Sequence, residues 1–134
     1  RARIIAAGAP CVQDAVITGL DRDDVGMLVV PRVDECRKLA GLADEVATSD
    51  ALRHPVVREF FQALVDRLWR EGTGSASRIA RAHVMAEPPS IDRDEVTDKG
   101  SINQRAVLRN RAALVERLYR DTEADDEVLL PRVE

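Results

Sequence analysis

The chain has 134 residues, a formal net charge of −4 and 33% charged residues. This length suits one domain with a real core, because domains commonly hold roughly 100–150 residues. The mild acidity disfavours a nucleic-acid-binding protein, because contacts with phosphates need a basic surface. No apolar run approaches the roughly 20 residues of a membrane-spanning helix, and no signal segment opens the chain. We therefore expect a soluble, cytoplasmic protein with no membrane partner.

The few cysteines and lysines further limit the kinds of functional site that the chain could contain. The two cysteines, Cys11 and Cys36, form no C-x-x-C pair, which excludes a disulfide scaffold and a cysteine-rich zinc site. Basic charge comes from 18 arginines and only two lysines, Lys38 and Lys99, so each lysine is a candidate for a specific role. The chain begins with Arg1 rather than Met, which suggests an excerpt from a longer protein.

The first third of the chain predicts a helix, a β-hairpin and a second helix. Residues 1–9 are typical of a helical turn or two. Two β-rich runs, 12–20 and 25–31, are joined by four polar residues and predict an antiparallel hairpin. The second run is almost wholly apolar, which indicates a strand covered on both faces. A short helix is predicted over residues 32–42.

Residues 48–74 carry the strongest helical pattern. Apolar side chains recur at the spacing i, i+1, i+4 and i+5, which is typical of a wide apolar helix face. Pro55 suits the first helical position and Gly72 suits the end. Three of the four aromatic residues lie on this stripe, and we interpret it as core packing. Its members are Val56, Val57, Phe60, Phe61, Leu64, Val65, Leu68 and Trp69.

The last third predicts a strand, a polar loop and a long helix. Residues 78–87 alternate loosely and predict a third strand, and residues 90–100 form an acidic loop. A helix is predicted over 101–120, with Ser101 and Gln104 in the form of a capping box.

The tail over 121–127 contains five carboxylates and is expected to be frayed or solvated. The predicted fold class is α+β, a small antiparallel sheet of about three strands flanked by helices. Because no internal linker is long enough to divide the chain, residues 1–134 are expected to form one domain.

Most residues with catalytic potential lack partners at a useful spacing. His54 and His83 have none, and we interpret both as structural. The acidic turn 21–24 lacks the glycine and the glutamate of a calcium loop, so no metal site is predicted. Arg111 falls within the apolar stripe of the last helix, and we interpret it as a snorkelling or ion-paired arginine at the edge of the core.

Lys99 is the remaining candidate. It lies between Asp98 and Gly100, directly before the predicted start of a helix. A lysine there is a mobile point charge that suits a phosphate or carboxylate on another surface, and the helix end adds positive potential. The alternative is a solvated lysine paired with Asp98 or Asp94, which composition alone favours because surface lysines are common.

The residues around Lys99 resemble a known family. Residues 95–108, with the sequence EVTDKGSINQRAVL, and 112–119, AALVERLY, are similar to the end of feruloyl-CoA synthetase-type enzymes. Those enzymes are AMP-forming acyl-CoA ligases of the adenylate-forming superfamily. Residues 12–19 and 21–26 resemble the hairpin that opens their small C-terminal domain. The resemblance covers most of the chain, in the correct order.

The resemblance implies a C-terminal lid that closes over a large N-terminal domain, which binds most of the ATP, Mg and carboxylic acid. The carboxylate attacks the α-phosphate to give acyl-AMP and pyrophosphate. The lid then rotates, and the thiol of CoA gives the thioester and AMP. By position, Lys99 matches the lysine that acts in adenylation only, within a motif loop of Thr97, Asp98 and Gly100. Arg22 is a candidate contact for the CoA phosphates, although the sequence favours the alternative that it is an ordinary surface arginine.

The sequence departs from the widespread superfamily string Pro-x-x-x-Ser-Gly-Lys. Asp98 precedes the lysine, and a longer acidic loop separates it from Pro88 and Pro89, as in the feruloyl-type branch. The resemblance implies an aromatic or other carboxylic acid as substrate, and the isolated fragment is expected to be inactive. The rival hypothesis is a non-catalytic α+β interaction or regulatory module, in which Lys99 has no special role.

Overall fold

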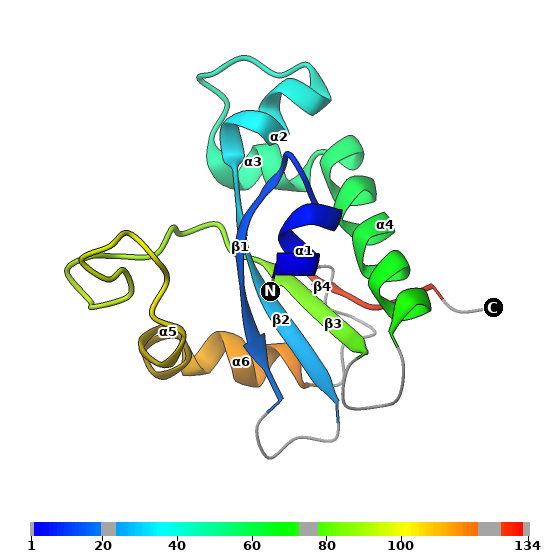
Figure 1. Cartoon of the computed structure of the whole chain (residues 1–134). Coiled ribbons are helices and arrows are strands. Elements are labelled where there is room, and N and C mark those ends of the chain that lie inside the picture. Colours follow the sequence, from blue (N-terminus) through cyan, green and yellow to red (C-terminus); the bar gives the residue numbers. More distant parts are fainter. Residues whose placement is uncertain (1, 20–23, 73–77, 121–126, 133–134) are drawn as a thin grey trace.

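A computed structural model of the chain describes residues 2–19, 24–72, 78–120 and 127–132. One four-stranded sheet has helices on both faces (Figure 1). The strands, in their order across the sheet, are β1 (Val12–Thr18), β2 (Val25–Pro31), β3 (Ile79–Val84) and β4 (Val128–Leu129). The helices are α1 (Ala2–Ala7), α2 (Val33–Ala40), α3 (Thr48–Arg53), α4 (Pro55–Glu71), α5 (Gln104–Asn110) and α6 (Ala112–Leu118). Within these ranges, no helix is long and apolar enough to cross a membrane.

The sheet confirms the α+β class and the predicted hairpin, but it is mixed and has one more strand than the expected three. β1 and β2 pair antiparallel, whereas β2 and β3 pair in parallel. The chain between β2 and β3, which includes α4, forms the crossover that a parallel pair requires. β4 contributes only two residues, too few for a recognisable sequence pattern, and pairs antiparallel with β3.

The central strand β2 is covered on both faces, as its sequence predicts. Met27 and Val29 belong to a core cluster that includes residues of α1 and α4. Leu28 and Val30 belong to a second cluster that includes residues of α5 and α6. Successive strand residues point to opposite faces of a sheet, so an almost wholly apolar strand fits this position.

The apolar stripe of α4 is confirmed as core. Phe61 is 2% exposed and its ring meets the edge of the Phe60 ring, with 5.4 Å between the ring centroids. Pro55 stands at the start of the helix and Gly72 follows its last residue. Val56 departs from the stripe, because it is 45% exposed.

The predicted helix over residues 101–120 is wrong in its start and in its continuity. The structure has two short helices, α5 and α6, separated at Arg111 (φ −112°, ψ 34°). Asn103 rather than Ser101 caps α5, because its side chain accepts a hydrogen bond from the backbone N–H of Ala106. The apolar spacing continues across the break, so periodicity does not detect it.

Gln104 pairs with an edge strand instead of closing a capping box. Its amide donates to the carbonyl of Ala15 at 3.0 Å and accepts from the N–H of Ile17 at 3.2 Å. β1 is an edge strand of the sheet, so its outward backbone groups need partners. The glutamine thus ties the start of α5 to β1.

We predict that Phe61→Ala lowers the free energy of unfolding by about 3–5 kcal/mol, because it removes a buried ring from the core. Val56→Ala, five residues earlier on the same helix, is expected to change it by less than about 0.5 kcal/mol. Urea unfolding followed by circular dichroism measures both. Equal losses for the two variants would contradict the assignment of the buried face.

Candidate functional site

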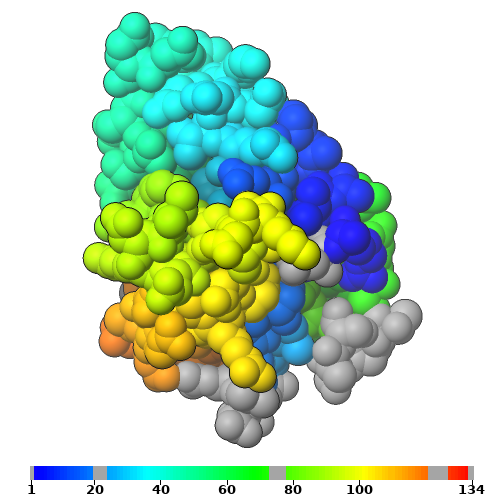
Figure 2. Space-filling view, turned by 60° about the vertical axis from the view of Figure 1, so that its left-hand side comes forward, coloured from blue at the N-terminus to red at the C-terminus, as the bar shows by residue number. Residues whose placement is uncertain are grey.

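Lys99 lies on a small hairpin between β3 and α5. Val96 and Ile102 form an antiparallel bridge at its base. In Figure 1 the segment that includes this hairpin extends away from the sheet, on the side opposite α4. Figure 2 shows the same segment, in yellow, on the surface of the domain. The hairpin therefore presents its tip outward.

Backbone hydrogen bonds fix the conformation of the hairpin tip. The carbonyl of Thr97 accepts from the N–H of Gly100 at 2.9 Å, and the N–H of Thr97 donates to the carbonyl of Ser101 at 2.8 Å. The two hydroxyl groups of Thr97 and Ser101 are 2.8 Å apart. Gly100 has φ +82°, a left-handed conformation that favours glycine and that is typical of the last residue in a three-residue hairpin loop.

The Lys99 side chain is exposed and makes no ion pair with any residue in the described ranges. The pairing with Asp98 or Asp94 that the alternative hypothesis expects is therefore not present. The other lysine differs, because Lys38 on α2 has Nζ 3.5 Å from a carboxylate oxygen of Glu35.

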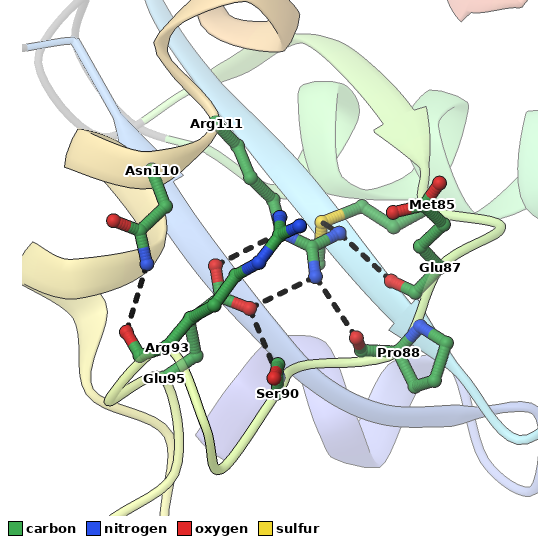
Figure 3. Close-up of polar contacts among 8 residues, drawn as sticks. All are labelled: Met85, Glu87, Pro88, Ser90, Arg93, Glu95, Asn110 and Arg111. Atoms are coloured by element: carbon green, nitrogen blue, oxygen red, sulfur yellow. Dashed lines mark hydrogen bonds and ion pairs between the residues drawn. The ribbon is translucent and has the colours of Figure 1, made fainter.

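A buried ion pair stands at the base of the hairpin. The Glu95 side chain is completely buried, and Arg111 is 9% exposed. Arg111 donates from Nε to one carboxylate oxygen at 3.1 Å and from Nη2 to the other at 3.0 Å. This two-point contact fixes the orientation of both planar groups, as Figure 3 shows.

The remaining donors of Arg111 bind the segment that leads from β3 to the hairpin. Its Nη1 donates to the carbonyl of Glu87 at 2.8 Å, and its Nη2 donates to the carbonyl of Pro88 at 2.9 Å. The backbone N–H of Ser90 donates to Glu95 Oε1 at 2.9 Å. A buried charge is tolerated only where such partners replace water.

These contacts hold Glu95 in its ionised form. Hydrogen bonds from Arg111 lower the pKa of the Glu95 carboxyl below its ordinary value. Burial acts in the opposite direction, and the backbone N–H of Ser90 adds to the lowering. The interpretation of Arg111 as an ion-paired arginine is thus confirmed. The sequence did not identify Glu95 as its partner. The only signal was the position of Arg111 in an apolar stripe.

A second polar group lies where β1 ends and β2 begins. The Tyr119 hydroxyl is 2.7 Å from the Thr18 hydroxyl and donates to the carbonyl of Asp24 at 2.9 Å. Arg81 donates to the Asp24 carboxylate at 2.9 Å, with its guanidinium carbon 5.1 Å from the centroid of the Tyr119 ring. Arg22, the candidate CoA contact, lies outside the described residues.

A cavity of about 390 Å³ lies away from Lys99. It is lined by residues of α3, α4, β3 and α6, among them Arg53, Arg117 and His83. Both arginines are ion-paired with the carboxylate of Glu127, at 3.0 and 3.1 Å. Lys99 is not part of its lining, but Arg111, which pairs with Glu95 at the base of the Lys99 hairpin, is.

Comparison with known proteins identifies the domain. Residues 2–123 match the family model described as AMP-binding enzyme C-terminal domain. The chain belongs to this family. No curated protein matches it.

Two solved structures of carboxylic acid reductase from Segniliparus rugosus are similar to this AMP-binding enzyme C-terminal domain. One is the A-PCP didomain in complex with AMP, with 21% sequence identity and a TM-score of 0.53, over 88% of this chain and 15% of that one. The other is the A domain with AMP and a co-purified carboxylic acid, with 21% identity and a TM-score of 0.49, over 87% and 17%. The chain thus spans only a small part of each relative, and the first comparison shows a shared fold.

The other polar candidates in this AMP-binding enzyme C-terminal domain have structural partners. His54 Nδ1 accepts from the N–H of Val56 at the start of α4, and His83 Nδ1 lies 3.0 Å from the carbonyl oxygen of Glu127. Cys11 and Cys36 are free and buried. Within the described ranges, no group of three or more histidine, cysteine or acidic residues could hold a metal ion.

The expectation of a frayed acidic tail is wrong at Glu127. This residue stands directly before β4, and the ion pairs with Arg53 and Arg117 hold it against α3 and α6. Hydrogen bonding by Arg53 lowers the pKa of its carboxyl group. Residues 121–126 lie outside the described part of the chain.

We predict that Glu95→Gln lowers the free energy of unfolding at pH 7 by about 3–5 kcal/mol, because it leaves the Arg111 charge buried without its counter-ion. The folded-state pKa of Glu95 lies below its ordinary value of 4.5, so its stabilisation is complete above pH 4.5. It is lost as the pH falls through the folded-state pKa. Urea unfolding of both proteins from pH 7 downward should therefore show a shrinking difference. A difference that does not change with pH would contradict the ionised pair.

Proposed function

We propose that this domain is the C-terminal lid of an AMP-forming carboxylate–CoA ligase similar to feruloyl-CoA synthetase. One observation carries the proposal: the domain presents an exposed Lys99, with no ion pair to any described residue, at the tip of a hairpin whose base is held by a buried ion pair. Its family membership and the motif around Lys99 support the same conclusion. We also propose that the reaction takes place in the cytoplasm.

The first half-reaction needs positive charge from outside the nucleotide site. A carboxylate oxygen attacks the α-phosphorus of ATP, a new P–O bond forms, and the bond to pyrophosphate breaks. The negative charges of the α-phosphate and the incoming carboxylate repel each other, and a cation that contacts the oxygens of both groups from the side reduces this repulsion. Lys99 supplies that cation when the lid closes, and its preorganised position lowers the barrier. Thr97, Asp98 and Gly100 hold the loop that carries it.

The second half-reaction does not use Lys99. The lid rotates, the CoA thiol attacks the acyl carbonyl, and AMP leaves with the electron pair of the C–O bond. Arg22 is proposed to contact the CoA phosphates in this orientation. The N-terminal domain supplies most contacts to ATP, Mg and the acid, an aromatic hydroxycinnamate by the resemblance to feruloyl-CoA synthetase. The lid alone is therefore expected to be inactive.

We predict that Lys99→Ala in the enzyme that contains this domain lowers ATP–pyrophosphate exchange by about 100-fold or more, because a preorganised cation leaves the transition state. Thioester formation from supplied acyl-AMP should stay at the wild-type rate. Lys38→Ala is the matched control, since it removes the only other lysine of these 134 residues, and it should leave both reactions unchanged.

Exchange at the full rate in Lys99→Ala would contradict the proposed role. Equal losses in both half-reactions would also contradict it, because Lys99 is assigned to adenylation alone. The rival hypothesis of a non-catalytic module predicts no effect of Lys99→Ala on either reaction.

A further inference from the structure

We infer that the buried Glu95–Arg111 pair positions the Lys99 hairpin and thereby sets the rate of adenylation without touching the substrates. This inference rests on the proposed function of Lys99. It assigns the two residues a positioning role, in addition to their contribution to stability.

The first step is the short covalent path from the pair to the lysine. Glu95 precedes Lys99 by four residues. Its carbonyl accepts from the N–H of Asn103 at 2.9 Å, across the base of the hairpin. Asn103 also caps α5 through its side chain. Glu95 therefore stands where both arms of the hairpin meet the start of α5, and a rotation there moves the tip.

The second step is the rigidity of the pair. Two parallel N–H···O contacts fix the plane of the Glu95 carboxylate against the Arg111 guanidinium. Arg111 also holds the carbonyls of Glu87 and Pro88, so one side chain fastens both ends of the segment that leads into the hairpin. The side chain of Asn110 adds a hydrogen bond to the carbonyl of Arg93 at 2.9 Å (Figure 3).

The third step is that the interaction at the base of the hairpin is a buried ion pair. A buried ion pair stabilises a fold little more than apolar side chains of the same size would, because both charges lose their water. It does fix one geometry, since a displaced guanidinium leaves a buried charge without its partner. A hairpin that carries a lysine to a reacting phosphate needs a fixed direction, because a misplacement of about 1 Å can cost about 100-fold in rate.

A second buried carboxylate provides the control for a purely structural effect. Asp66 on α4 has a side chain that is 8% exposed, and it accepts from Arg132 Nε at 2.8 Å and from the Arg132 backbone N–H at 2.7 Å. α4 covers the face of the sheet opposite α5 and α6. Asp66→Asn removes a buried charge whose hydrogen-bond partners among the described residues, Gln62 and Arg132, lie outside the Lys99 hairpin.

The experiment uses the full-length enzyme with Glu95→Gln, Arg111→Lys, Asp66→Asn, Lys99→Ala and the double variant of Glu95→Gln with Lys99→Ala. Each is assayed for ATP–pyrophosphate exchange and for thioester formation from supplied acyl-AMP, at a temperature where circular dichroism shows it folded. Glu95→Gln and Arg111→Lys should lower exchange by roughly 10- to 100-fold and leave thioester formation unchanged. Asp66→Asn should lower the melting temperature and leave the ratio of the two rates unchanged.

The double variant shows whether the pair acts through the lysine. In the Lys99→Ala background, Glu95→Gln should cause no further loss of exchange, because the group that it positions is already absent. A full additional loss there would overturn the inference. So would a loss in both half-reactions, or a selective loss in Asp66→Asn. If Glu95→Gln does not fold, Arg111→Lys decides the question, since it keeps the positive charge and loses the two-point contact.

The two proposals fail in different ways. If Lys99→Ala keeps full exchange, the proposed function of Lys99 is wrong, whatever the other variants do. If Lys99→Ala abolishes exchange and both pair variants keep the wild-type ratio of rates, the proposed function stands and the positioning inference is wrong.

Discussion

Glu95 and Arg111 place two opposite charges inside the domain, where either one alone would be costly. Much of the surrounding structure provides hydrogen-bond partners for these two charges. The helix is interrupted between α5 and α6 at Arg111. The guanidinium of Arg111 donates hydrogen bonds to two carbonyl groups of the segment that follows β3. The hairpin that carries Lys99 starts at the other member of the pair. One interaction thus fixes the junction of two helices, a loop path and a hairpin.

The domain consists of a well-packed sheet with helices on both faces and a projecting hairpin that carries the charge of Lys99. β2 stands in the centre of the sheet with apolar clusters on both faces, and the helices of both layers pack on it. Two of the arginines that line the cavity beside β3, Arg53 and Arg117, are ion-paired with Glu127, whereas Lys99 is exposed on the hairpin. This arrangement suits the proposed lid role, because a lid brings a single group to a site that another domain builds.

Local patterns in the sequence were enough for the elements that depend on local packing. The β1–β2 hairpin and the stripe of α4 are confirmed, because hydrophobic periodicity is a property of neighbouring residues. The two-residue strand β4 and the parallel pairing of β2 with β3 depend on contacts between distant segments, so no local pattern reports them. For the site, the motif singled out Lys99. Arg111 in an apolar stripe indicated a snorkelling or an ion-paired arginine, but several carboxylates precede it, and only the path of the loop selects Glu95 as its partner.

The central claim is that the Lys99 hairpin meets the reacting groups during adenylation. A crystal structure of the full-length enzyme with a bound acyl-AMP analogue tests this most directly. The account predicts that Lys99 Nζ lies within hydrogen-bond distance of an oxygen of the phosphate or the acyl group, with the Glu95–Arg111 pair intact. A lid closed over the analogue with Lys99 in solvent, and another cation of the domain at the phosphate, would contradict it.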